Sequence, residues 1–271
     1  MPLITISRNI ACGGEAIAKR VAEKLGLELY DDQRLQEEAI RMGIRSEDLK
    51  SLDEKAPGLF DRILNKKPEL YFEFMESVVY QVAKQDKGVI LGHGSQMLLR
   101  DFGCALHVLV HSDASARVRR LMEVQHISQN VAENLIRKKD SEQKGFFQFA
   151  FHMDWNDPSL YDLIINTGKL GEDFAVRLIA ETAKSDEVAA CSLTALSAMD
   201  RLSGEKKIQA ILLKNDISLS MLHIEVSEDG GAYVGGVVST KEEKDRIAKV
   251  INDIPGISEI RTEVSVMPVG V

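Results

Sequence analysis

A short apolar strand that leads through a small-residue loop directly into an amphipathic helix constrains the fold of this chain most. Residues 3–17 read LITISRNIACGGEAI, a β-branched run followed by small residues. Ile17, Val21 and Leu25 then recur every four residues, which is typical of the buried face of a helix. The first N–H groups of a helix have no partner inside it and carry a partial positive charge, so they attract anions. The segment therefore predicts a phosphate-binding loop between a strand and a helix.

Further apolar runs of strand length follow at intervals, and helical patterns separate them. The candidate strands are Leu3–Ser7, Leu27–Tyr30, Gly88–Leu91, Ala105–His111 and Asp162–Asn166. Continuous apolar strands that alternate with helices are typical of a parallel sheet covered on both faces. Such sheets bind ligands at the carboxyl ends of their strands, where the loop after the first strand lies. We expect an α/β domain built on a five-stranded parallel sheet.

The composition changes after this domain. Residues 168–184 predict its closing helix, and the Ala- and Ser-rich residues 185–204 predict a linker that includes a helix. A further helix is expected over Lys206–Lys214, followed by a hairpin that turns at Asp229-Gly230-Gly231, a second helix and a last strand. We therefore expect a domain over residues 1–184, a linker over 185–204 and a small αββαβ domain over 205–271.

Charge and cysteine content exclude several classes of protein. The net charge of −8 argues against nucleic acid or an anionic membrane as a partner, because both reward a basic surface. Cys12, Cys104 and Cys191 lie far apart without a CxxC spacing, so we expect neither a disulfide framework nor a metal site, and the cytoplasm as the compartment. Neither an apolar run of about 20 residues nor a secretory signal is visible.

The loop departs from the usual phosphate-binding motif, G-x-x-x-x-G-K-[ST]. Over residues 8–15 the motif matches only at Gly13. Arg8 stands at the first glycine, Gly14 at the lysine and Glu15 at the hydroxyl residue. Glu15 suits the helix dipole but repels a phosphate, whereas Arg8 could replace the missing lysine charge. Two interpretations stay open, a phosphate cradle and an ordinary strand-to-helix turn.

Several segments along the chain carry a resemblance to known families. In the first domain they read ITISR (4–8) with GG (13–14), LYD (29–31), VILGHG (89–94), DWNDP (154–158), and LYDL (160–163) with NT (166–167). On these segments the first 184 residues resemble the cytidylate kinase-like family of nucleoside-monophosphate kinase folds. YVGGVVS (233–239) and IPGI (254–257) make residues 205–268 resemble a BON domain.

The resemblance implies a P-loop fold of the nucleoside-monophosphate kinase type. It also implies phosphoryl transfer from ATP, with Mg²⁺, to a nucleoside monophosphate, with a pyrimidine base expected. Such chemistry depends on positioning and on cations around the transferred group. The resemblance to a BON domain implies binding of a phospholipid or another ligand. Because residues 185–271 carry a net charge of −5, an anionic lipid surface is disfavoured, and we expect a small ligand, an ion or self-association.

Candidate site residues follow from the loop and from the resemblance. The catalytic candidates are Arg8, Arg137 and Lys144. Nucleotide and phosphate contacts are expected from Ser7, Arg8, Ala11, Cys12, Gly13, Gly14, Glu15 and Ala16. Acceptor contacts are expected from Asp31, Gly92 and His93, and lid contacts from Arg117, Arg120, Arg137 and Asp140. No residues are expected to hold a metal directly.

The sequence departs from the family pattern at three further positions. Ala11 stands where the family prefers glycine, His93 where related kinases have an arginine, and Gln143 where the lid usually ends in arginine. Three hypotheses therefore remain: an active phosphotransferase, a catalytically degenerate nucleotide sensor that signals through the BON domain, and an assembly scaffold.

Three side chains have ordinary structural interpretations beside functional ones. Asp32 is interpreted as a helix N-cap. Trp155 is interpreted as a packing residue rather than a platform for a base. Cys12 is interpreted as a small loop residue, and the alternative is a redox-sensing thiol whose pKa is lowered by the helix start.

Overall fold

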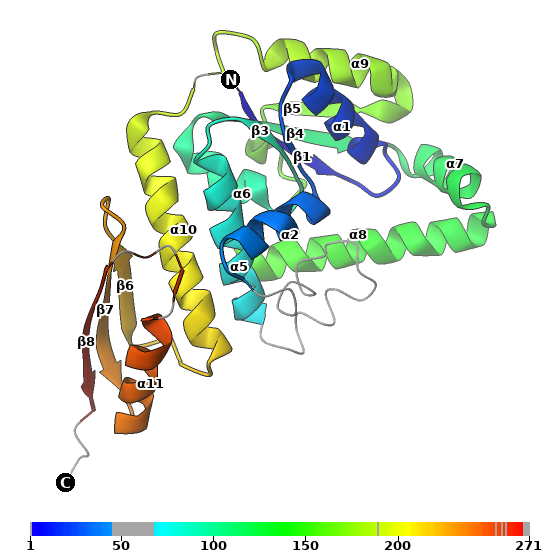
Figure 1. Ribbon diagram of the computed structural model, residues 1–271. Coiled ribbons are helices and arrows are strands. Elements are labelled where there is room, and N and C mark those ends of the chain that lie inside the picture. The colour runs from blue at the N-terminus through cyan, green and yellow to red at the C-terminus, as the bar shows by residue number, and fades with distance from the viewer. Residues whose placement is uncertain are drawn as a thin grey trace. The chain divides into compact units, whose positions relative to one another are not determined.

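The chain divides into two units in a computed structural model, which describes residues 2–44, 68–188, 190–252, 254–255, 257 and 259–267 (Figure 1). The first unit consists of Met1–Arg34 and Gln85–Ser192. The second consists of Leu35–Lys84 and Leu193–Val271. Gly256, part of the turn expected after the last helix, and Ala189 of the expected linker lie outside the described residues.

A five-stranded parallel sheet forms the centre of the first unit. Its strands are β1 (Leu3–Arg8), β2 (Leu29–Tyr30), β3 (Gly88–Leu91), β4 (Ala105–His111) and β5 (Leu163–Asn166). Their order is β2-β3-β1-β4-β5, with β1 in the middle between β3 and β4. The carboxyl ends of β1, β3 and β4 therefore meet at one edge, as the sequence predicts.

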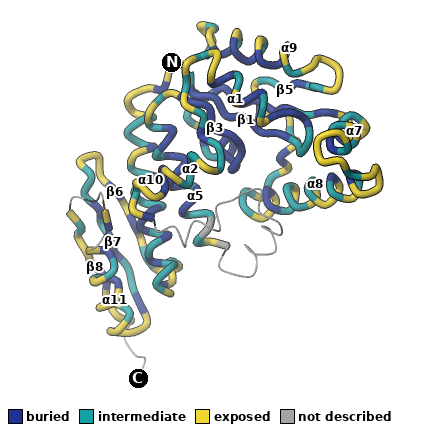
Figure 2. Tube along the Cα trace, turned by 45° about the vertical axis from the view of Figure 1, so that its right-hand side comes forward, coloured by how far each residue is buried: buried dark blue, intermediate teal, exposed yellow. Residues whose placement is uncertain are grey.

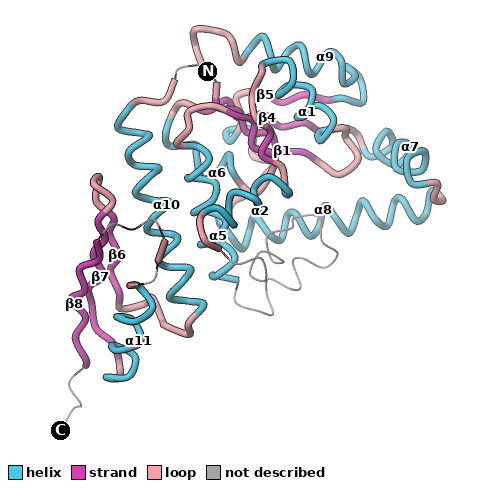
Figure 3. Tube along the Cα trace, in the orientation of Figure 1, coloured by secondary structure: helices cyan, strands magenta, loops and turns pink. Residues whose placement is uncertain are grey.

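Helices cover both faces of this sheet (Figures 1 and 3). On one face α1 (Gly14–Leu25) and α9 (Thr167–Thr182) pack together over the strands through side chains such as Ile17 and Ile179, and on the other α6 (Ser95–Leu99) contacts β1. The strands β1 and β3 are fully buried, as Figure 2 shows. The predicted α/β architecture is confirmed.

Two further helices form a smaller cluster in the first unit. They are α7 (Ala114–Gln125) and α8 (Gln129–Phe151), which pack on each other around Leu121, Ala132 and Ile136. Short 3-10 turns follow α6 at Arg100–Phe102 and precede β5 at Pro158–Leu160.

The second unit contains a helical layer. It is formed by most of α2 (Asp32–Arg41), by α5 (Pro68–Ala83) and by α10 (Leu193–Lys214). Ser77 and Ser203 each donate a hydroxyl hydrogen bond to the other's carbonyl oxygen, at 2.8 and 2.9 Å. Lys206 contacts the carboxylates of Glu73 and Glu76 at 3.0 and 2.8 Å. The helix expected within the linker and the helix expected over Lys206–Lys214 are therefore one helix, α10, which α5 supports.

A three-stranded sheet follows α10. The strands β6 (Leu222–Val226) and β7 (Gly231–Val238) form an antiparallel hairpin, and β8 (Glu259–Val266) pairs in parallel with β7. The helix α11 (Lys241–Ile251) connects β7 to β8 along the chain, and its Ile247 and Ile251 share a core with Ile208 and Leu212 of α10. The αββαβ order predicted for this region is confirmed.

The expectation of no disulfide is wrong. Cys104 and Cys191 form a disulfide with Cα atoms 4.8 Å apart, and Cys12 is a free, buried cysteine. The two bonded residues are 87 positions apart in sequence, so no local spacing reveals their proximity. Among the described residues, no helix has both the length and the apolar character needed to cross a bilayer.

Candidate functional site

The loop between β1 and α1 has a backbone shaped by two left-handed residues. Ala11 has φ 62° and Gly13 has φ 86° and ψ 6°, and α1 begins at the next residue. Gly14 has no room for a side chain, since a Cβ there would lie 2.5 Å from the Cβ of Arg8. The first-turn N–H groups of α1, from Gly14 to Ala16, have no intrahelical acceptor and point out of the helix start. This arrangement can bind an anion.

Neighbouring strands and α9 hold the loop in place. The Asn9 N–H and the Cys12 thiol both donate to the Val110 carbonyl oxygen at 3.2 Å. The Thr167 hydroxyl donates to the Cys12 carbonyl oxygen at 2.7 Å. Burial raises the pKa of Cys12 to about 11, so the redox alternative, which needs a lowered pKa, is contradicted and the small-loop-residue interpretation fits.

Charged side chains border the loop. Arg8 is 8% exposed and forms an ion pair with Glu15 at 3.3 Å. From α9, the carboxylate of Glu172 lies directly over the position that a side chain at Gly13 would occupy, and Arg120 of α7 pairs with it. Sequence reasoning missed Glu172, which reaches the loop only through the tertiary fold.

The expected lid residues divide into two groups. Arg117 is 5% exposed, donates to the Ile10 carbonyl oxygen at 2.9 Å and binds both carboxylate oxygens of Asp140 at 2.8 to 3.0 Å. Gln143 also reaches the loop and donates to the Arg8 carbonyl oxygen at 3.3 Å. The structure thus ties α7 and α8 to the loop.

Two other candidates on α8 lie apart from these contacts. Arg137 and Lys144 are exposed, and neither side chain forms a hydrogen bond or an ion pair with a described residue. The structure therefore brings Arg117, Arg120 and Asp140 to the loop region but leaves Arg137 and Lys144 at the surface.

The expected acceptor residues lie at the carboxyl ends of β2 and β3. Gly92, His93 and Gly94 are three consecutive residues with positive φ, between 58° and 78°, and the Gly92 N–H donates to the Ile6 carbonyl oxygen at 3.0 Å. His93 is 2% exposed, and its Nε2 lies 2.8 Å from Asp32 Oδ1. This turn is thereby fixed beside the end of β1.

The structure corrects the expected role of Asp32. Asp31 accepts the Arg34 N–H at 3.0 Å, which is the hydrogen bond of an N-cap, while Asp32 is the first residue of α2 and binds His93. Asp31, which the sequence predicted to contact the acceptor, therefore uses its carboxylate to cap α2.

A buried polar network lies next to this turn. The Tyr161 hydroxyl donates to the Trp155 carbonyl oxygen at 2.6 Å and accepts from Gln96 Nε2 at 3.3 Å. Gln96 is fully buried, and its Oε1 has no hydrogen-bond partner among the described residues. Burial raises the pKa of Tyr161 to about 12, which keeps the hydroxyl protonated. Trp155 is 2% exposed and stacks on Phe147, which confirms its packing role.

Carboxylates that could contribute to a metal site border the loop. The described parts of the chain contain no group of three or more His, Cys, Asp or Glu side chains placed to hold a metal ion. Glu15 and Glu172 border the loop, and their hard carboxylate oxygens fit Mg²⁺, which keeps several waters and relies on substrate phosphates. The donor set therefore fits a magnesium ion that arrives with a phosphate ligand.

Comparison with known proteins identifies the family. Residues 3–169, more than half of the chain, match the model of the cytidylate kinase-like family. The chain belongs to the cytidylate kinase-like family. Residues 204–268 match the BON domain model.

Similar proteins of this family are cytidylate kinases at low identity. That of Archaeoglobus fulgidus is 24% identical over 187 residues, which cover 68% of this chain and 96% of the relative. That of Desulfurococcus amylolyticus is 29% identical over 182 residues, 66% of this chain and 91% of the relative. A solved structure of an uncharacterized protein from Eubacterium ventriosum covers 68% of this chain and 99% of its own, with 24% identity and a TM-score of 0.51, and it supports the fold.

Proposed function

We propose that this chain is a nucleotide-binding phosphotransferase that transfers the γ-phosphoryl group of ATP to a pyrimidine nucleoside monophosphate. The observation that carries the proposal is the β1–α1 loop. Its two left-handed residues turn the chain into α1, and its Gly14 allows the side chain of Arg8 to pack against the helix start. A phosphate is the ligand that such a helix start favours.

Donor phosphates would bind the N–H groups of Gly14, Glu15 and Ala16 in this proposal. Arg8 and Arg120 border the same loop, and Arg8 would supply the charge that the missing lysine provides elsewhere. Mg²⁺, held by phosphate oxygens, water and a carboxylate of Glu15 or Glu172, neutralises charge on the donor phosphates when it is bound.

The acceptor would bind at the turn of Gly92 to Gly94, beside the end of β1. His93 is oriented by Asp32, and the fully buried Gln96 lies on the helix that follows. An oxygen of the acceptor phosphate would form the new bond to the γ-phosphorus while the bond to the β–γ bridging oxygen breaks, which leaves a nucleoside diphosphate on each side. The chain's residues would position the two phosphates and stabilise charge, and no general base is required of them.

A second function, nucleotide sensing without turnover, is favoured by the state of the lid cations. Arg117 is buried against Asp140, Arg120 is paired with Glu172, and Arg137 and Lys144 are exposed. A protein with this arrangement could bind a nucleotide and signal through its BON domain. An assembly scaffold is the remaining alternative.

The proposal includes an organisation and a location. A kinase-like domain over residues 1–184 would be followed by a linker over 185–204 and a BON domain over 205–271, and the family matches over 3–169 and 204–268 support this division. The BON domain would bind a small ligand or an ion, or mediate self-association. The cytoplasm is the location proposed for this activity because nucleotides are abundant there, whereas the Cys104–Cys191 disulfide removes the argument from the cysteines.

The test is an assay of the purified chain with ATP, Mg²⁺ and a panel of CMP, dCMP, UMP, AMP and GMP, with nucleoside diphosphates as the readout. Formation of CDP, dCDP or UDP supports the transferase. A rise in melting temperature with nucleotide but no product supports the sensor, because a ligand that binds the native state stabilises it. Arg8→Ala and Arg8→Lys form a matched pair. We expect Arg8→Ala to lose nucleotide binding and Arg8→Lys to retain it. Unchanged binding in both variants would remove Arg8 from the site.

A further inference from the structure

The second unit contains a cavity of about 340 Å³ that no part of the kinase proposal uses. It lies between the end of α2, the end of α5, α10 and the turn between β6 and β7. Charged side chains from all four elements line it, and Met42, Val226 and Ile257 contribute apolar surface. The cavity belongs to a size class that holds small molecules.

The charges on its walls do not balance. The lining includes four cations and three carboxylates, of which the pairs are Arg41 with Glu38, Lys84 with Asp200, and Arg201 with Glu228. The fourth cation is Lys207 of α10, and no carboxylate among the described residues pairs with it. One positive charge therefore remains uncompensated.

Lys207 is also buried, which is unusual for a lysine. Its side chain is 7% exposed, and its Nζ donates to the carbonyl oxygen of Pro255, which lines the same cavity. An ammonium group has three donors, and a buried one without a counter-charge is unfavourable. Burial accordingly lowers the pKa of Lys207 to about 8. An oxyanion in the cavity would supply both the missing acceptors and the missing charge.

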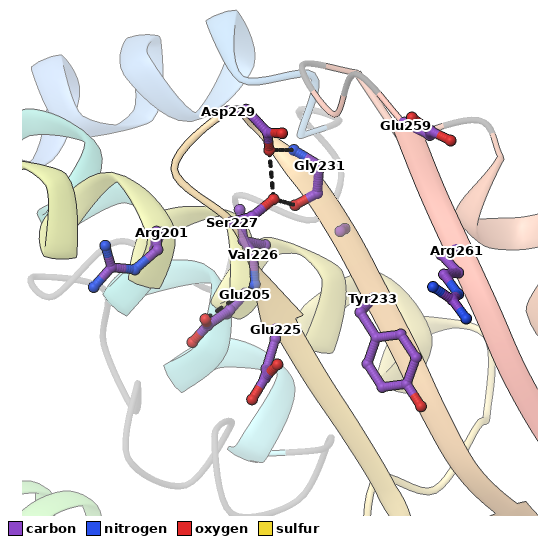
Figure 4. A pocket seen from close by; sticks show the side chains of 11 residues that line it. Arg201, Glu205, Glu225, Val226, Ser227, Asp229, Gly231, Tyr233, Glu259 and Arg261 are labelled. Atoms are coloured by element: carbon purple, nitrogen blue, oxygen red, sulfur yellow. Dashed lines mark hydrogen bonds between the residues drawn. The ribbon is translucent and has the colours of Figure 1, made fainter.

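A second, larger hollow of the same unit lacks this feature (Figure 4). It measures about 560 Å³ and is lined by residues of α10 and of the three strands. Its polar side chains serve local hydrogen bonds: Glu205 accepts the Val226 N–H at 3.1 Å, and Asp229 accepts the Gly231 N–H at 3.1 Å within the hairpin turn. No buried cation faces it among the residues shown, so the smaller cavity is the stronger candidate for a ligand.

We propose that the cavity around Lys207 binds a small organic anion, with its carboxylate or phosphate head on Lys207 and its body against the apolar wall. The three ion pairs at the walls would orient the ligand and exclude a second anion. The proposal does not depend on phosphoryl transfer, since every residue involved lies in the second unit.

The test uses the full chain without nucleotide and four probes in calorimetric titrations at pH 7. Benzoate, phenyl phosphate and inorganic phosphate present an oxyanion, and benzylammonium has the same ring with the opposite charge. At least one anion is expected to bind and benzylammonium is not. Lys207→Met, which keeps the length of the side chain, is expected to lower the anion affinity at least tenfold. Lys214→Met, on the same helix but outside the cavity lining, is expected to leave it within twofold.

The pH dependence provides a second readout. The other charged groups that line the cavity are the three ion pairs named above, and burial lowers the pKa of Lys207 to about 8. Anion affinity should fall about tenfold per pH unit above pH 8, as the lysine loses its proton, and Lys207→Met should abolish this slope. Binding of no anion, equal binding by Lys207→Met, or equal binding of benzylammonium would overturn the proposal. A melting curve of Lys207→Met verifies that the variant is folded.

Discussion

Replacing Glu172 by Gln tests whether the β1–α1 loop gathers a phosphate. The carboxylate of Glu172 lies over Gly13 and holds Arg120 in an ion pair. A phosphate on the first-turn N–H groups of α1 would lie beside Gly13 as well. It would therefore be repelled by Glu172 and would need the same arginine. Gln keeps the size of the side chain and removes the charge.

The size of the effect follows from distance and exposure. Two like charges about 4 Å apart repel by roughly 1 kcal/mol in water and about 4 kcal/mol near a protein surface. Glu172 is 25% exposed and Arg120 is 41% exposed, so solvent screens much of this interaction. A net gain of about 1 to 2 kcal/mol is expected, which makes ATP binding about 5- to 30-fold tighter.

The assay is a calorimetric titration with ATP at low and high salt, in EDTA so that no metal bridges the two anions. Asp173→Asn is the matched control, because Asp173 is adjacent, 79% exposed and paired with Arg20 at 2.6 Å on another helix. It should change the affinity less than twofold. The advantage of Glu172→Gln should shrink at high salt. Binding equal to or weaker than that of the unmodified chain, or an equal gain in Asp173→Asn, would refute the reasoning.

Three further predictions concern stability. Gly94→Ala should lower the free energy of unfolding by about 2 to 4 kcal/mol, because φ is +67° and a Cβ would lie 2.6 Å from an aromatic ring. The control is Gly26→Ala, where φ is +64° but the space is open, and it should cost only about 1 to 2 kcal/mol. Urea unfolding measures both. Cys104→Ser should lower the free energy of unfolding by about 2 to 4 kcal/mol without reductant, since it opens a long disulfide loop. With reductant, the variant and the unmodified chain should be equally stable. Lys207 should make the chain more stable as the pH rises from 8 to 10.5, by about 3 kcal/mol. The reason is that its pKa is lowered to about 8 in the folded chain, so the unfolded state binds more protons in that range. Lys207→Met should lack this rise in unfolding titrations across pH 7 to 11.

The strands of the first unit could be predicted because their signal is local. An apolar run such as Gly88–Leu91 or Ala105–His111 is bounded by residues that end it, and the structure reproduces both ranges. The loop after β1 is also local, since small residues precede a helix whose periodicity is clear. Where the packing partner decides, the prediction is incomplete. The helix expected in the linker and the helix expected over Lys206–Lys214 are one helix, α10, which α5 supports through Ser77 and Ser203, 126 residues apart in the chain.

The candidate site shows the same division. Ala11 to Gly14 could be recognised in sequence, but the partners that give each charge its role could not. Arg117 looks like any helical arginine, and its burial against Asp140 depends on how α7 meets α8. Glu172 reaches the loop from a helix that begins more than 150 residues further along the chain. A sequence pattern can locate the anion-binding backbone, whereas the neutralising carboxylates are a property of the fold.

These carboxylates separate the two proposed functions. The pair of Arg117 with Asp140 is bidentate and its arginine side chain is 6% exposed, so a phosphate could take that arginine only by breaking the hydrogen bonds of a buried cation. Arg120 in its pair with Glu172 is 41% exposed, so exchange of its carboxylate for a phosphate costs less. Arg120 is therefore the lid cation that can follow the transferred group. If Arg120 stays on Glu172 when a nucleotide is bound, the chain senses nucleotides; if it moves to the phosphate, the charge needed for transfer is in place.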